Sequence, residues 1–133
     1  MEQYLSLCGE TMKARISEVI GQYVAVELDV EGAIKLLETL REELDKGGED
    51  VDDAIRMLRN FDTFYEFARK KFKEYLTPKK NMTDLIKGRV LVDKLKLIKK
   101  DDQRSAVIIF DRSVKRDSIV QALQKLGYEI EEG

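Results

Sequence analysis

The hydrophobic periodicity of the chain changes from helical to extended partway along, and this change limits the fold to a mixture of helices and strands. Between positions 29 and 76 apolar residues recur at three- and four-residue steps, which line one face of a helix. Between positions 89 and 111 they form extended runs, with Ser-Ala-Val-Ile-Ile-Phe at 105–110. The sequence therefore predicts an α+β fold in which N-terminal helices are followed by a ββαβ unit.

The length of the chain fits a single domain. A chain of 133 residues can bury a core without disulfides or a structural metal, and 43% apolar residues are too many for a disordered chain. We therefore predict one α+β domain over residues 1–133. Residues 1–76 form its mainly helical, acidic part, and residues 77–133 form a basic hairpin plus an αβ segment.

The beginning of the chain is predicted to contain two helices and one short strand. A stripe of apolar residues at helical spacing predicts a first helix over about residues 2–20. The segment 23–28 has β-branched residues at alternate positions and is predicted as a strand, with continuation of the first helix as the alternative. Asp29 is predicted to cap a second helix, which ends at Gly47.

A third helix is predicted to be long and unbroken. Apolar residues form a continuous stripe from Ala54 to Leu76, and Pro78 is expected to end this helix because its ring cannot continue one. We expect the stripe to be core. Phe67 lies about 60° outside it on a helical wheel and is therefore expected to contact another element or a second chain.

The second part of the chain has the pattern of a hairpin, a helix and a closing strand. The predicted elements are a helical turn at 83–87, strands at 89–99 and 104–111, a helix at 119–126 and a strand at 128–131. If 23–28 joins the sheet, the order of elements matches a ferredoxin-like sandwich with an extra long helix, which is the arrangement we favour.

The stretch from Ser105 to Glu131 resembles the closing β-α-β unit of heavy-metal-associated domains. The matching residues are Val-Ile-Ile-Phe-Asp at 107–111 and Ile-Val-Gln-Ala-Leu-Gln-Lys-Leu-Gly-Tyr-Glu-Ile at 119–130. The resemblance covers about a fifth of the chain and implies topology alone. Those domains bind metal through a Cys-x-x-Cys loop, whereas Cys8 is the single cysteine of this chain, so no metal function carries over.

The residue inventory lacks the groups that most enzymes and metal sites use. The chain has no histidine, which removes the commonest general base and metal ligand together. Phosphate-binding loops, dinucleotide fingerprints and nucleophile elbows have no candidate. Cys8 lies on the apolar side of the predicted first helix, where a free cysteine behaves as a small hydrophobic residue. We predict a non-enzymatic protein with no catalytic residue, metal, cofactor or small-molecule substrate.

Two groups of acidic residues could either stabilise the fold or bind a metal ion. The carboxylates at positions 49, 50, 52 and 53 open the third helix, where capping and the helix dipole explain them better than Mg²⁺ or Ca²⁺. Asp29 and Asp111 each follow an extended run. Helix capping and strand termination explain them, and a shared metal site is the alternative.

Charge is segregated along the chain although the net charge is only −2. Residues 1–76 carry 11 basic and 17 acidic side chains, residues 77–116 carry 12 and 5, and residues 117–133 carry 1 and 4. The positive excess coincides with the predicted hairpin.

A basic stripe is predicted on this hairpin, because alternation places Lys94, Lys96 and Lys100 on one face of its first strand. The candidate surface for a nucleic acid or an acidic partner consists of Lys94, Lys96, Lys100, Arg104, Arg89, Lys79 and Lys80. Such lysines bind phosphate backbones, and they also prevent edge-to-edge aggregation of an exposed strand. No aromatic residue interleaves with them, so base stacking is not expected on the hairpin.

Two binding functions remain. The first is a protein-protein interaction or assembly module that self-associates as a homodimer, because acidic and basic regions of one domain attract each other between molecules. Phe67 is the residue expected at that interface. The alternative is a nucleic-acid-associated protein that contacts the phosphate backbone of DNA or RNA through the basic hairpin.

We expect a small soluble protein in the cytoplasm. A single cysteine gives no indication of an oxidising compartment, and the first 22 residues carry acidic side chains where a signal peptide needs a basic start. The longest uninterrupted apolar run, 106–110, falls short of the roughly 20 residues that cross a bilayer, so no membrane partner is expected. The charged fraction of 38% is typical of thermophilic proteins.

Overall fold

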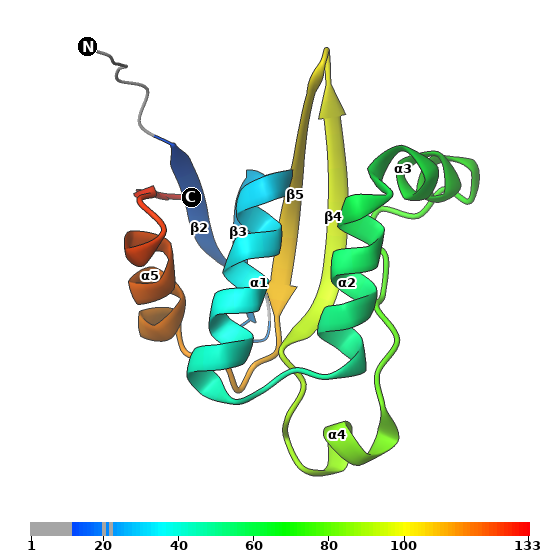
Figure 1. Ribbon diagram of the computed structural model, residues 1–133. Coiled ribbons are helices and arrows are strands. Elements are labelled where there is room, and N and C mark those ends of the chain that lie inside the picture. Colours follow the sequence, from blue (N-terminus) through cyan, green and yellow to red (C-terminus); the bar gives the residue numbers. More distant parts are fainter. Residues whose placement is uncertain (1–11, 20, 22) are drawn as a thin grey trace.

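The computed structural model describes residues 12–19, 21 and 23–133, which form one five-stranded mixed sheet with helices (Figure 1). The strand order is β4-β5-β3-β2-β6, and β2 and β6 are the parallel pair. The strands are β2 (Lys13–Val19), β3 (Tyr23–Asp29), β4 (Val92–Lys100), β5 (Gln103–Phe110) and β6 (Glu129–Glu132). The predicted α+β class is confirmed.

Three helices cover one face of this sheet. α1 (Val30–Leu44), α2 (Glu49–Arg59) and α5 (Arg116–Lys125) lie in front of the strands in Figure 1, and the core lies between these helices and the sheet. α3 (Phe61–Lys70) lies beside the edge strand β4. α4 (Met82–Ile86) projects beyond the end of the sheet at which β4 begins.

The predicted first helix is wrong over its second half, where the chain forms β2. Ala14 and Ile16 are buried while Lys13 and Arg15 are exposed, so two-residue alternation decides the structure rather than the helical stripe. Strands therefore come before helices in the described chain. The predicted helix residues 2–11, with Cys8, lie outside the described residues. The predicted strand at 23–28 is confirmed as β3.

The predicted long helix is also wrong as a single element. It divides into α2 and α3 at Asn60, whose backbone angles of φ −113° and ψ 45° are not helical. α3 ends at Lys70, well before Pro78, so the proline is not what ends it. Leu76 then pairs with Leu95 at the outer edge of β4 through backbone hydrogen bonds of 2.7 and 2.8 Å. The residues of the apolar stripe therefore belong to two helices, α2 and α3, and to the extended segment at Leu76.

The ferredoxin-like sandwich is not confirmed. In that arrangement the final strand of the β-α-β-β-α-β unit pairs with the first strand of the unit. Here β2 lies between β3 and β6 and pairs antiparallel with the former and parallel with the latter. The difference follows from the first correction, because residues predicted as helix insert a strand into the sheet.

The predicted β4-β5 hairpin is confirmed, with one irregularity at Asp93. Val92 and Lys94 lie opposite consecutive residues of β5, which leaves Asp93 as the extra residue of a β-bulge. The bulge lets Val92 and Leu95 both face the core, although strict alternation predicts opposite faces for them. The predicted turn at 83–87, helix at 119–126 and strand at 128–131 correspond to α4, α5 and β6.

Asp50 ties α2 to the beginning of β4. Its fully buried carboxylate accepts hydrogen bonds from the backbone N–H groups of Leu91 (2.8 Å) and Val92 (2.9 Å) through Oδ2. Oδ1 accepts a third from the N–H of Gly48 (2.9 Å). A buried carboxylate is stable when it accepts several such bonds. The acid therefore joins two elements that are about 40 residues apart in sequence.

Candidate interaction surface

The face of the sheet opposite α1, α2 and α5 is not covered by a helix in the part of the chain that the structure describes. Side chains of all five strands reach this open face, because alternate residues of a strand point to opposite sides. The strand register gives one row across it, which is Lys96, Val107, Glu27, Arg15 and Glu131. Basic and acidic side chains therefore alternate across the open face.

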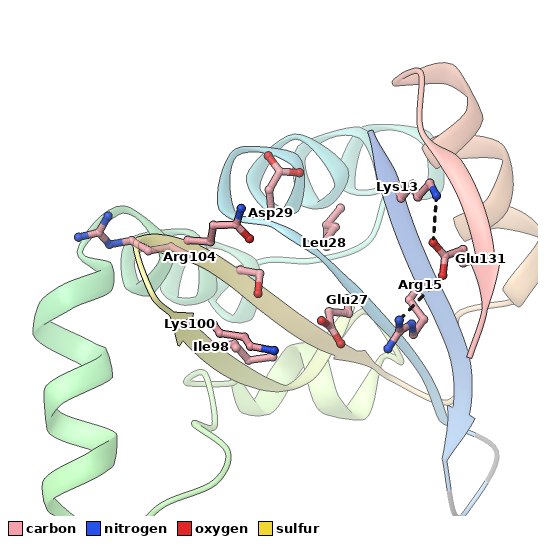
Figure 2. Close-up of a pocket in the computed structure, with 11 residues that line it drawn as sticks. Lys13, Arg15, Glu27, Leu28, Asp29, Ile98, Lys100, Arg104 and Glu131 are labelled. Carbon is pink, nitrogen blue, oxygen red and sulfur yellow. Dashed lines mark ion pairs between the residues drawn. The ribbon is translucent and has the colours of Figure 1, made fainter. Parts of the chain in front are cut away.

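A charged hollow of about 550 Å³ occupies the part of the open face near the β4-β5 turn (Figure 2). Its charged lining residues are Lys13, Arg15, Lys100, Arg104, Glu27, Asp29 and Glu131. Glu131 pairs with Lys13 at 3.7 Å and with Arg15 at 3.9 Å. Glu27 makes no ion pair with a described residue, and Figure 2 shows its carboxylate between Arg15 and Lys100.

The carboxylate of Asp29, at the rim of this hollow, is held by structural contacts. Oδ2 accepts a hydrogen bond from the N–H of Gly32 at 3.2 Å and so caps α1. Oδ1 accepts a hydrogen bond from the hydroxyl of Tyr128 at 2.5 Å. Burial, together with this hydrogen bond, raises the pKa of Tyr128 well above its usual value, so the hydroxyl stays protonated. Asp29 thus connects β3, α1 and the beginning of β6.

An apolar hollow of about 680 Å³ lies at the other end of the open face, where β2, β3 and the β4-β5 hairpin contribute Val19, Tyr23, Lys94 and Ile109. Two tyrosines line it, with Val19 and the nearly buried Ile109 between charged neighbours. The Nζ atom of Lys96 lies 5.7 Å from the ring centroid of Tyr75, and the guanidinium of Arg112 lies 5.9 Å from that of Tyr23. Tyrosines in such a setting are favoured anchors of protein interfaces.

The charges that line the two hollows balance. Among the described residues five are basic and five are acidic, namely Lys13, Arg15, Lys94, Lys100 and Arg104 against Glu18, Glu27, Asp29, Asp93 and Glu131. A balanced surface neither attracts a polyanion strongly nor repels a second copy of itself.

Three residues of the predicted basic surface do share one face. Lys94, Lys96 and Lys100 lie on the open face of β4, opposite Ile109, Val107 and Gln103 of β5. Lys96 pairs with Glu74 at 3.5 Å.

Three of the other four predicted basic side chains are held elsewhere by acidic partners or a backbone carbonyl, and the fourth, Lys79, is exposed. Arg104 turns away from the hollow in Figure 2 and binds Asp62 of α3 through two hydrogen bonds of 3.0 and 3.1 Å, which lower the pKa of that carboxyl. Arg89 pairs with Asp45 at 3.8 Å, and the Nζ of Lys80 donates to the backbone carbonyl of Asp93 at 2.9 Å. Lys79 contributes only its backbone N–H, which donates to the carboxylate of Asp53 at 2.9 Å.

Phe67, the predicted interface residue, lies on α3 and is 44% exposed. It is not among the residues that line either hollow. The two tyrosines of the apolar hollow were not predicted as functional. Tyr23 lies at the beginning of a predicted strand, and Tyr75 belongs to the predicted helical stripe although α3 ends at Lys70. No local sequence signal identifies Tyr75, because its place beside the sheet follows from the pairing of Leu76 with Leu95.

The acidic residues considered as metal ligands do not gather into one site. Asp29 is the last residue of β3 and Asp111 follows β5, and because these two strands are antiparallel neighbours the acids lie at opposite ends of the sheet. Asp111 accepts hydrogen bonds from the N–H (3.0 Å) and hydroxyl (2.6 Å) of Ser113. Within residues 12–19, 21 and 23–133, no group of three or more Cys, Asp or Glu side chains is arranged to hold a metal ion.

No known protein family matches the chain, and neither curated proteins nor solved structures give a match. Among the described helices, none combines the length and apolar character needed to cross a membrane.

Proposed function

We propose that this protein is an assembly module in which two copies associate through the open faces of their sheets. The observation that supports this most is a five-stranded face that no described helix covers and that combines a tyrosine-lined apolar hollow with balanced charges. The apolar hollow supplies the burial that drives association, and the alternating charges set the orientation of the two copies. The interface is isologous, so each contact occurs twice.

The size of the open face indicates weak association. Five strands that average seven residues, spaced about 4.8 Å apart and rising about 3.3 Å per residue, give a flat area of about 550 Å². Specific interfaces bury about 600–1,000 Å² on each partner, so this face lies just below that range. We expect a dissociation constant in the micromolar range rather than a permanent dimer.

Sedimentation velocity over a concentration series tests this proposal. Tyr75→Asp places a charge in the apolar hollow, and Glu27→Lys removes the alternation of charge across the row. Each is expected to weaken association at least tenfold. The matched controls are Met82→Asp on α4 and Glu42→Lys on α1, which leave association unchanged. A wild-type protein that remains monomeric at millimolar concentration overturns the proposal, as does equal weakening by variants and controls.

Nucleic-acid binding through the hairpin is the second candidate function. The observation in its favour is that Lys94, Lys96 and Lys100 share the open face of β4, beside the ring of Tyr75. The carboxylate of Glu27 on the same face speaks against it, because it repels a phosphate backbone.

Fluorescence titration of labelled DNA and RNA at several salt concentrations separates the two candidates. If the hairpin binds nucleic acid, changing Lys94, Lys96 and Lys100 to Glu abolishes an affinity that falls steeply with salt. Absence of binding by the wild-type protein at low salt removes this candidate and leaves the assembly proposal unaffected.

A further inference from the structure

Phe72, directly after α3, is an apolar side chain that the fold does not use. It is 96% exposed and has a positive φ of 56°. Its N–H donates to the carbonyl of Arg69 (3.2 Å), and the N–H of Lys73 donates to that of Ala68 (2.9 Å). This pair of bonds is a Schellman cap, in which glycine normally occupies the position of Phe72.

The choice of phenylalanine at this position is unfavourable for folding. A side chain raises the energy of the left-handed backbone conformation, which glycine adopts freely. A side chain that stays in water gains nothing from burial in return. A residue that strains the backbone without packing against anything indicates a role outside the folding of the chain.

The surroundings of Phe72 are strongly basic. We define the α3 tip as Phe67, Arg69, Lys70, Lys71, Phe72 and Lys73, which contains four cationic and no acidic side chains. The two flanking acids are already paired, Glu66 with Arg69 at 3.2 Å and Glu74 with Lys96 at 3.5 Å. The Nζ of Lys73 lies 5.8 Å from the ring centroid of the half-exposed Phe67. The α3 tip therefore suits a ligand that is both anionic and apolar.

We infer that the α3 tip adsorbs to the surface of an anionic phospholipid membrane, with Phe72 as its apolar anchor. Lys and Arg side chains are attracted to anionic headgroups, and an aromatic side chain inserts at the boundary with the acyl chains. With 96% of its surface exposed, Phe72 is not packed against the described part of the chain, which suits immersion in lipid. A base-stacking platform is usually supported by the protein on one side.

The position of α3 permits this contact. Figure 1 shows α3 at the margin of the molecule, beyond the edge strand β4, where a flat surface reaches it without meeting the sheet. Adsorption of this kind needs no membrane-spanning helix, which is why a hydropathy criterion does not find it. The α3 tip shares no residue with the two hollows, so this inference stands or falls independently of self-association.

Tryptophan fluorescence provides a direct test, because the chain contains no tryptophan. In Phe72→Trp the emission is expected to shift to shorter wavelength on addition of vesicles of phosphatidylcholine and phosphatidylserine, and not with phosphatidylcholine alone. Met82→Trp, exposed on α4, serves as the control and is expected to show no shift. An unchanged emission of the Phe72→Trp protein with anionic vesicles overturns the inference.

Vesicle flotation then assigns the contributions of individual side chains. Phe72→Gly is expected to weaken partitioning about tenfold, the equivalent of burying one aromatic side chain. It should also raise the melting temperature by a few degrees, because it relieves the left-handed strain, so lost binding is not explained by unfolding. Retained partitioning of Phe72→Gly contradicts the inference.

Charge reversal distinguishes the α3 tip from the hairpin. Changing Lys70, Lys71 and Lys73 to Glu is expected to reduce partitioning at least a hundredfold, since each cation contributes about fivefold. The matched control changes Lys87, Lys94 and Lys100 to Glu, which leaves the pair of Lys96 with Glu74 in place, and it retains most of the binding. Equal loss in both triple variants contradicts a site at the α3 tip.

A single-stranded oligonucleotide is the competing ligand. If the wild-type protein binds it, loses that binding in Phe72→Gly and does not float with anionic vesicles, the membrane inference is wrong and the α3 tip is a nucleic-acid site.

Discussion

At the scale of single residues, the acids that the sequence places at the beginning of α2 differ in what they hold. Asp50 is fully buried and accepts three backbone hydrogen bonds, one from Leu91 just before β4 and one from Val92, the first residue of β4. Asp52, two positions later, is exposed and pairs with Arg41 at 2.6 Å. Their position at the start of a helix predicts capping for both. The bonds from Asp50 to Leu91 and Val92 depend on the tertiary fold, so no nearby sequence pattern predicts them.

Asp50→Ala is expected to lower the free energy of unfolding by about 3 kcal/mol, because it leaves three backbone N–H groups without their acceptor. Asp52→Ala removes one exposed ion pair and is expected to cost less than about 1 kcal/mol. Urea unfolding of both variants measures the difference. Similar losses for the two would mean that the Asp50 carboxylate does not join α2 to β4.

The hydrogen bond from Tyr128 to Asp29 makes stability sensitive to high pH. The pKa of Tyr128 is raised in the folded state, above its ordinary value of 10.0, so the protonated hydroxyl stabilises the fold fully below pH 10. This contribution is lost as pH rises above 10, because the unfolded chain then releases the Tyr128 proton more easily than the folded chain does, which favours unfolding. Tyr128→Phe is expected to lower the free energy of unfolding by about 1–2 kcal/mol at pH 7. The variant should also lack the decline of stability above pH 10 that comes from the Tyr128 hydroxyl.

Urea unfolding of both proteins between pH 8 and pH 11 checks this expectation. The other tyrosines titrate in both proteins and therefore cancel in the comparison. An identical decline of stability with pH in the two proteins would contradict the assigned role of Tyr128.

At the scale of elements, local patterns predicted the second half of the chain better than the first. The hairpin, α5 and β6 combine alternation or helical spacing with clear ends such as Gly127. Residues 13–19 fit a helical stripe and an alternating strand equally well, and pairing with β3 and β6 decides between the two. The break at Asn60 has no proline or glycine to announce it, so the long stripe concealed two helices.

The bulge at Asp93 gives a prediction for the hairpin. Deleting Asp93 leaves Val92, Lys94 and Leu95 in regular alternation with their present faces, so the fold is expected to survive with a loss of about 1–2 kcal/mol. Deleting Lys96 instead moves Leu97 to the open face and should prevent folding or cost more than about 3 kcal/mol. Thermal unfolding compares the two. A deletion of Lys96 that is tolerated as well as that of Asp93 would contradict the register.

At the scale of the whole molecule, folding redistributes the charge that is segregated in the sequence. Arg104 of the basic hairpin binds Asp62 of the acidic part, and Lys96 binds Glu74, so basic and acidic segments neutralise each other within one molecule. Lys94, Lys96 and Lys100 could be placed on one face from alternation alone. The convergence of β2, β3 and β6 with them depends on strand order, which the sequence pattern did not specify.

The basic residues of the α3 tip are not apparent when charge is summed over the whole N-terminal part of the chain. They belong to the first 76 residues, whose excess of acidic side chains masks four cations in five positions. A shorter window would have found them. The exposure of Phe72 among them depends on the early end of α3, which the predicted long helix excluded.

Photo-crosslinking from the apolar hollow tests the assembly proposal most directly. A photoreactive phenylalanine analogue at position 75 is expected to give covalent dimers whose yield rises with protein concentration and whose crosslinks join it to open-face residues of the second copy. The same analogue at position 82 on α4 should give none. Absence of dimers from position 75, or equal yields from the two positions, would contradict association through the open face.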